Sequence, residues 1–221
     1  VKPRCLEHEK FWNKIDILDK KAMLSFFKRF HADYVVHLAA RTDLDGASIE
    51  EYSTNTIGVE NVIHCINNAK YDIKKTIFAS SMLVCELGYI PNSEFDFKPS
   101  TIYGESKVIG EKIIRDNISQ SVDWLIVRPT SLWGPWFSIP YRNFFDAVLS
   151  GYYFHPKGVN VSRSYGFIDN SIDQIVCLLN TEDNRVLSSV HYLADYKPLD
   201  IYEFACEINF HTTYSKIHTL P

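Results

Sequence analysis

The sequence predicts an α/β fold with a doubly wound parallel sheet of the Rossmann type, followed by a small mixed α/β lobe. Two observations carry this prediction. Segments with helical periodicity alternate with short apolar segments rich in β-formers, at intervals of roughly 35 to 45 residues. Alternation of this kind is typical of parallel strands joined by right-handed helical crossovers, because neighbouring parallel strands cannot be joined by a tight turn.

The individual elements follow in order along the chain. Three helix–strand pairs are predicted, with helices at 22–30, 47–69 and 103–117 and strands at 34–40, 75–81 and 124–129. The last of these strands ends at Pro129, which removes a backbone donor from the ladder. We therefore assign residues 1–130 to the sheet domain and residues 131–221 to the second lobe.

Composition excludes several classes of protein. With 23 Lys and Arg against 27 Asp and Glu, the net charge is −4, which is unlike that of a general nucleic-acid binder. Apolar runs are shorter than the ~20 residues that a bilayer demands, so no membrane partner is expected. The five cysteines are widely separated and form no C-x-x-C pair, which favours reduced thiols and a cytoplasmic location. The segment Asp43–Gly46 lacks the later ligands of a calcium loop, so no metal is expected.

The sharpest chemical signal is the pair Tyr103 and Lys107. Residues four apart lie on one helix face, so the ammonium of Lys107 is expected to lower the pKa of the Tyr103 phenol and make it an acid–base group. Ser81, at the end of the preceding strand, can hydrogen-bond a substrate hydroxyl or carbonyl oxygen. Oxidation at that carbon also needs a hydride acceptor, which no side chain provides, so a nicotinamide cofactor is implied.

Four segments together resemble the extended short-chain dehydrogenase/reductases, and more narrowly the NAD-dependent epimerase/dehydratase family that modifies nucleotide sugars. They are Ser80-Ser81, Tyr103-x-x-x-Lys107, the strand end 37–40, and the segment 128–135. The resemblance implies an NAD-dependent enzyme, with NADP left open, that acts on a nucleotide sugar. A homodimer also stays open.

The resemblance implies roles for individual residues. Catalysis is assigned to Ser81, Tyr103 and Lys107, with Asn55 as a fourth member that could instead be a hydrogen-bonded helix amide. Cofactor contacts are assigned to Asp16, Ile17, Leu38, Ala39, Ala40, Arg41, Ser80, Tyr103, Lys107, Pro129 and Thr130. Asp16 could instead be the N-cap of the helix that begins near Lys20, and Arg41 a solvated loop charge.

Substrate contacts are assigned to Ser81, Ser131 and Arg163. Arg163 opens a segment that resembles the family's Arg-x-Tyr-x-x-Val-Asp-Asp pattern, in which the guanidinium meets a diphosphate. Asn170 replaces the second Asp of that pattern, and Ser131 stands where many sugar epimerases carry Asn. The aromatic segment 133–145 is interpreted either as a packed lid or seam or as a platform for a base.

Two departures from the family pattern qualify these assignments. Met82-Leu83 stands where 4,6-dehydratases carry an acid and a base, so epimerisation or carbonyl reduction is expected in place of elimination. The first glycine is Gly46, so the Gly-rich phosphate-binding turn is missing, and we expect a sheet truncated at its N-terminus that alone binds NAD weakly. The alternative is a catalytically silent sensing or dimerising module.

Overall fold

The computed structural model describes residues 3, 5–137, 141–195, 197–212 and 217–220. It divides the chain into two compact units, Val1–Arg128 with Thr181–His191, and Pro129–Asn180 with Tyr192–Pro221. The first boundary lies close to the predicted one at residue 130. The segment 181–191, predicted to lie in the second lobe, belongs to the first unit in the structure.

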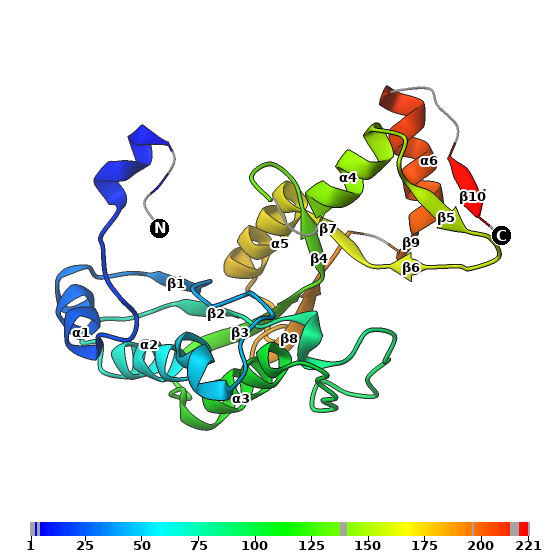
Figure 1. Ribbon diagram of the computed structural model, residues 1–221. Helices are drawn as coiled ribbons and strands as arrows, with labels where there is room; N and C mark the ends of the chain where they lie inside the picture. Colours follow the sequence, from blue (N-terminus) through cyan, green and yellow to red (C-terminus); the bar gives the residue numbers. More distant parts are fainter. Residues whose placement is uncertain (1–2, 4, 138–140, 196, 213–216, 221) are drawn as a thin grey trace. The chain divides into compact units, whose positions relative to one another are not determined.

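The first unit is built on a four-stranded sheet in the order β1 (Tyr34–His37), β2 (Lys75–Ala79), β3 (Asp123–Pro129) and β8 (Ser189–Leu193) (Figure 1). β1 pairs with β2 and β2 with β3 in parallel, with Val36 beside Ile77 and Ile77 beside Leu125. Parallel pairing brings the carboxyl ends of these three strands to one edge, which is where ligands bind in open α/β sheets. The predicted Rossmann-type fold is confirmed in this respect.

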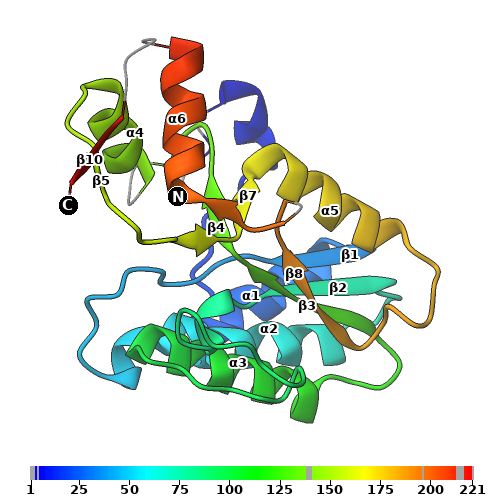
Figure 2. The ribbon, with the colours of Figure 1, turned by 90° about the vertical axis from the view of Figure 1, so that its right-hand side faces the viewer.

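Three helices, α1 (Lys20–Arg29), α2 (Ile57–Asn67) and α3 (Ile102–Asn117), lie along one face of this sheet (Figure 2). Three short 3-10 helices, η1 (Leu6–Phe11), η2 (Ile49–Asn55) and η3 (Met82–Val84), occur in the connections. The buried core between helices and sheet consists of Met23, Val59, Val62, Ile63, Cys65, Ile66, Ile73, Phe78, Ile114 and Ile126. Each predicted helix–strand pair of the first 130 residues is therefore present.

Side-chain caps set where these helices begin. Asp19 caps α1 by accepting hydrogen bonds from the backbone N–H groups of Lys21 and Ala22, and Thr101 caps α3 through Gly104. Asp16, the residue weighed as a possible cap, instead accepts the backbone N–H of Leu18 at 2.9 Å within the preceding turn.

The described residues of the second unit form several short strands and three helices. They are β4 (Ser131–Trp133), α4 (Tyr141–Leu149), β5 (Phe154–Pro156), β6 (Ser162–Arg163), β7 (Tyr165–Phe167), α5 (Ile168–Asn180), β9 (Leu199–Asp200), α6 (Ile201–Thr212) and β10 (His218–Leu220). The strands pair as β4 with β7, β5 with β10 and β6 with β9, and α4 lies beside α6 (Figure 2). None of the described helices is long and apolar enough to cross a membrane.

Aromatic rings form much of the packing in the second unit. The ring of Trp133 lies 5.4 Å from that of Phe145, 5.0 Å from Phe167 and 5.8 Å from Phe204. Phe144 stacks on Phe204 at 5.9 Å. The packed interpretation of the aromatic segment therefore holds for Trp133, Phe144 and Phe145, whereas Trp136 and Phe137 are exposed and residues 138–140 lie outside the described residues.

Glycine lets the start of α3 approach the carboxyl end of β2. A Cβ atom on Gly104 would overlap the carbonyl oxygen of Leu83, and one on Gly110 would lie 2.9 Å from the carbonyl oxygen of Asn55. Both obstacles are backbone atoms, which cannot rotate away as a side chain would. The two glycines therefore fix how closely α3 approaches η3 and η2.

We expect Gly104→Ala to lower the free energy of unfolding by about 1–3 kcal/mol, because the added methyl group forces the backbone of α3 away from Leu83. Urea unfolding followed by circular dichroism measures this change. The exposed neighbour Glu105 supplies the control, since Glu105→Ala should change stability by less than about 0.5 kcal/mol. Equal stability of the two variants would contradict the close approach.

Candidate functional site

Three residues predicted to be catalytic lie together at the carboxyl end of β2. Ser81 follows this strand and caps η3 by accepting the backbone N–H of Leu83, while Tyr103 and Lys107 occupy successive turns of α3. A side-chain hydrogen bond joins Ser81 to the phenol of Tyr103. The Lys107 Nζ atom lies 5.8 Å from the centroid of the Tyr103 ring. All three side chains are buried.

Lys107 is anchored by the backbone of β2. Its Nζ donates a hydrogen bond to the carbonyl oxygen of Ala79 at 3.0 Å. Burial lowers the pKa of Lys107 to about 8, and the negative charge of Glu111 acts in the opposite direction. At neutral pH the side chain is therefore a protonated ammonium, but its pKa is close enough to neutral for its charge to respond to its surroundings.

The expectation that Lys107 lowers the pKa of Tyr103 is wrong for the chain as it stands. Burial raises the pKa of Tyr103, the hydrogen bond from Ser81 lowers it, and the neighbouring phenol of Tyr52 raises it further. The four-residue spacing places an ammonium near the phenol but contains no information on the loss of water around it. Desolvation disfavours the phenolate and exceeds the favourable contacts.

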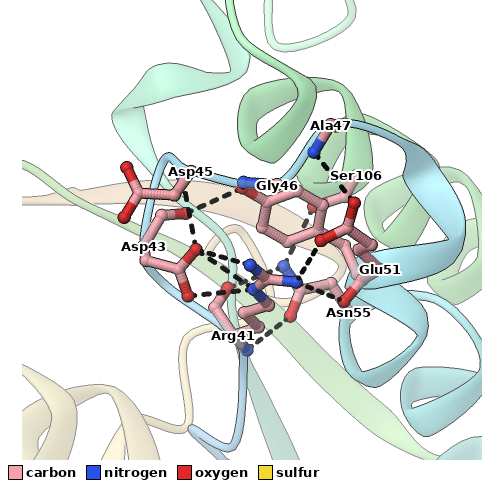
Figure 3. A network of polar contacts seen from close by, with 9 residues as sticks. Arg41, Asp43, Asp45, Gly46, Ala47, Glu51, Asn55 and Ser106 are labelled. Carbon is pink, nitrogen blue, oxygen red and sulfur yellow. Dashed lines mark hydrogen bonds and ion pairs between the residues drawn. The ribbon is translucent and has the colours of Figure 1, made fainter.

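Asn55 organises the loop that follows β1 (Figure 3). Its side-chain oxygen accepts the backbone N–H of Arg41 at 2.9 Å, and its amide nitrogen donates to the Arg41 carbonyl at 3.0 Å and to the Ser106 hydroxyl at 2.9 Å. Ser106 in turn donates to the carbonyl of Tyr103 at 2.6 Å. Asn55 thus connects the loop after β1 with the first turn of α3, which corresponds to the hydrogen-bonded amide of the alternative interpretation.

The guanidinium of Arg41 is held within the same loop. It forms ion pairs with Asp43 at 2.9 Å and with Glu51 at 3.0 Å, and it lies 4.9 Å from the ring centroid of the buried Tyr52 (Figure 3). The Tyr52 hydroxyl donates to the carbonyl of Asp43 at 2.9 Å and accepts the N–H of Gly46 at 3.1 Å. Arg41 is therefore a structural ion-pair partner in this chain and not a freely solvated charge.

The other predicted cofactor residues of the first unit lie before α1, after β1 and after β2. Ile17 packs against the core, and the amide of Asn61 donates to its carbonyl at 2.9 Å. Leu38 and Ala39 follow β1 and are exposed, and Ala40 is half-buried. Ser80 is buried beside Ser81, and its hydroxyl donates a hydrogen bond to Glu111.

The predicted residues of the second unit are placed separately. Thr130 follows Pro129 and donates both its backbone N–H and its hydroxyl to the carbonyl of Leu193, at 3.0 and 2.9 Å. Ser131 is buried at the start of β4, and Arg163 is half-buried in β6. Asn170 donates to the carboxylate of Asp195 at 2.9 Å, so that carboxylate lies beside the position where the family pattern has its second Asp.

Sequence reasoning missed three buried polar side chains beside the predicted site. His37 ends β1, Glu111 lies one turn after Lys107, and Arg128 lies near the end of β3. A signal for two of them was present. Glu111 continues the four-residue spacing of Tyr103 and Lys107, and Arg128 interrupts an otherwise apolar strand.

Comparison with known proteins identifies the family of this chain. The model of the "NAD dependent epimerase/dehydratase family" matches residues 2–189. This chain belongs to that family. UDP-glucose 4-epimerase 2 of Oryza sativa subsp. japonica is 31% identical over 124 residues, which cover 52% of this chain and 29% of that protein. The chain therefore matches only about a third of the length of this curated relative.

Solved structures of family enzymes share the fold. UDP-glucuronic acid 4-epimerase from Bacillus cereus, in complex with UDP-glucuronic acid and NAD, superposes with a TM-score of 0.74 at 20% identity, over 93% of this chain and 66% of that one. The dTDP-4-dehydrorhamnose reductase from Bacillus anthracis str. Ames, in complex with NADP, gives 0.74 at 19% identity, over 94% and 71%. At these identities the likeness establishes the fold.

His37 should make the free energy of unfolding depend on pH. Burial, together with the nearby ammonium of Lys107, lowers the pKa of His37 from 6.5 to about 4. His37 therefore binds a proton near pH 6.5 in the unfolded chain but only near pH 4 in the folded chain. The stability that the neutral histidine contributes is present above pH 6.5 and is lost as the pH falls toward 4. Between pH 7.5 and 5 we expect a loss on the order of 2 kcal/mol.

This loss should be largely absent in His37→Gln and retained in His8→Gln, because His8 is exposed in η1. Urea unfolding at the two pH values measures the difference for each protein. The same pH dependence in His37→Gln as in the unsubstituted chain would show that His37 is not the responsible group.

Proposed function

We propose that the protein to which this chain belongs is an NAD(P)-dependent enzyme that epimerises a nucleotide sugar or reduces a keto sugar. The observation that carries this proposal is the cluster of Ser81, Tyr103 and Lys107 at the carboxyl end of a parallel strand, in a chain of the NAD-dependent epimerase/dehydratase family. Two solved enzymes with the same fold, an epimerase and a reductase, support this reaction class.

The residues present fit a nicotinamide dinucleotide. Among the described residues, the Lys107 ammonium donates a hydrogen bond to one acceptor, the carbonyl of Ala79. The ammonium has three N–H donors in total. The remaining donors suit ribose hydroxyls, and the exposed segment Leu38–Ala39 offers an apolar surface after β1. When bound, the cofactor supplies the hydride acceptor and donor that the side chains lack.

Each of the three residues then has a distinct task. Tyr103 exchanges a proton with the sugar hydroxyl or carbonyl oxygen, since its phenol carries a transferable proton and lies beside Ser81. Ser81 orients that oxygen with its hydroxyl. Lys107 remains cationic at neutral pH and favours the phenolate as it forms.

Arg163 supports a nucleotide diphosphate as the part of the substrate that anchors the sugar. It lies in β6, its side chain is half-buried, and its segment matches the family pattern in which a guanidinium meets the diphosphate. A planar guanidinium donates two parallel hydrogen bonds to phosphate oxygens, which an ammonium cannot do. Ser131 contributes a further hydroxyl on β4.

In the whole protein, Tyr103→Phe should lower turnover by about 10²-fold or more while cofactor still binds, because the variant keeps the ring and loses only the transferable proton. Initial rates with a UDP-hexose or 4-keto sugar and calorimetric titration with NAD measure the two effects. Tyr34→Phe, on an exposed residue at the opposite end of β1, should leave turnover unchanged. Near-normal activity in Tyr103→Phe would remove the phenol from the mechanism.

The reaction should return the hydride without loss of water. Met82 and Leu83 directly follow Ser81 and form η3, so the two positions after the serine carry no group that transfers protons. We expect the whole protein, given UDP-hexoses, to interconvert them at C4, or to reduce a supplied 4-keto sugar. Mass spectrometry that detects a 4-keto-6-deoxy product, one water lighter, would contradict this. Absence of any sugar or cofactor chemistry would favour the silent module.

A further inference from the structure

A carboxylate that the proposed mechanism does not use lies directly behind the site. Glu111 is on α3, four residues after Lys107 and eight after Tyr103, so the three side chains follow one another along one face of the helix. Its side chain is fully buried, as is that of its partner Arg128. Buried charges of this kind are rare in proteins unless they are paired.

The carboxylate of Glu111 accepts hydrogen bonds from a residue of β3 and from the residue that follows β2. Arg128, in β3, donates from Nε to one carboxylate oxygen at 2.9 Å and from its second terminal nitrogen to the other oxygen at 2.8 Å. Ser80, after β2, donates its hydroxyl to the first of these oxygens at 2.6 Å. Arg128 also donates to the carbonyl of Glu94 at 2.7 Å.

We propose that Glu111 and Arg128 form a positioning pair, which fixes the strand end carrying Ser81 against the helix carrying Tyr103 and Lys107, and which supplies the negative charge that faces Lys107. The proposal rests on the proposed function only for its effect on turnover. Its structural and electrostatic parts concern this chain alone.

The geometry favours a positioning role over a purely stabilising one. Burying two charges costs free energy that their attraction only partly returns, so such a pair is a poor source of stability. A guanidinium fork, in contrast, bonds a carboxylate in one orientation, which defines the relative placement of the two elements that carry them. Ser80 extends this constraint to the residue next to Ser81.

The groups around Lys107 show why the negative charge of Glu111 affects the pKa of Lys107. A cavity of about 10 Å³, large enough for one water molecule at most, is lined by side chains of all the neighbouring elements. It has His37 from β1, Asn55 from η2, Val59 from α2, Ala79 at the end of β2, Ser80 after it, and Lys107 and Glu111 from α3.

Among these lining groups the charges are those of Lys107 and Glu111, because His37, with its pKa lowered to about 4, is neutral at pH 7. The nearby phenol of Tyr103 is also uncharged, since burial raises its pKa. Glu111 raises the pKa of Lys107 against the larger effect of burial. Without its negative charge, Lys107 should therefore lose its proton at a lower pH.

The electrostatic part is tested in the whole protein by following the ¹³Cε resonance of Lys107 during a pH titration, assigned by its disappearance in Lys107→Arg. In Glu111→Gln we expect the Lys107 pKa to fall by about one unit. Glu105→Gln, the same substitution at an exposed position of the same helix, should leave it unchanged. Equal Lys107 titrations in Glu111→Gln and the unsubstituted protein would overturn the electrostatic part.

The positioning part is tested by steady-state kinetics. We expect Glu111→Gln to lower kcat about tenfold or more with little change in KM, and to move the alkaline limb of the pH–rate profile to lower pH together with the Lys107 titration. Arg128→Lys keeps the positive charge but loses the fork, so it should lower kcat without moving the Lys107 titration. Unchanged kcat in a folded Arg128→Lys would overturn positioning, even where Glu111→Gln fails to fold.

These readouts separate the inference from the proposed function. The Lys107 titration needs no substrate, so it remains decisive if the unsubstituted protein shows no sugar chemistry. If the unsubstituted protein is active and Glu111→Gln matches it in kcat and in Lys107 titration, the proposed function stands and the positioning pair fails.

Discussion

The approach of α3 to the carboxyl end of β2 is the constraint on which the rest of the site depends. It brings Tyr103 to Ser81 and allows the ammonium of Lys107 to reach the carbonyl of Ala79. Gly104 permits it, since any side chain there would overlap the backbone of Leu83. The glycine between Tyr103 and Lys107 is therefore as much a part of the site as its neighbours.

Burial has different consequences for the groups that this approach encloses. It raises the pKa of Tyr103 and lowers the pKa values of Lys107 and His37, because in each case the charged form loses water. A histidine that stays neutral beside Lys107 adds no repulsion at neutral pH. Glu111 is then the negative charge among the groups lining the cavity beside Lys107, and it is held in place by Arg128.

The elements that the sequence predicted well are those whose signal is local. Apolar periodicity located the helices and strands of the first unit, and the spacing of Tyr103 and Lys107 placed both on one helix face. The return of β8 to the first sheet was missed, since pairing between distant segments leaves no local pattern. The predicted direction of the Tyr103 pKa shift was wrong because desolvation depends on the whole fold. Asn55 and Arg41 illustrate the same limit, since their partners could only be assigned in three dimensions.

The protonation state of Tyr103 bears on which direction of the proposed reaction this site is prepared for. With its pKa raised by burial, the phenol carries its proton at neutral pH, which is the state that donates to a carbonyl oxygen as a ketone is reduced. Oxidation of a hydroxyl requires the phenolate, and its formation in a desolvated site needs compensating positive charge. Lys107, whose Nζ lies 5.8 Å from the centroid of the Tyr103 ring, supplies such a charge, and its pKa of about 8 leaves that charge dependent on Glu111. Reduction of a carbonyl leaves the same phenolate behind, so both halves of an epimerisation would depend on the buried carboxylate through Lys107.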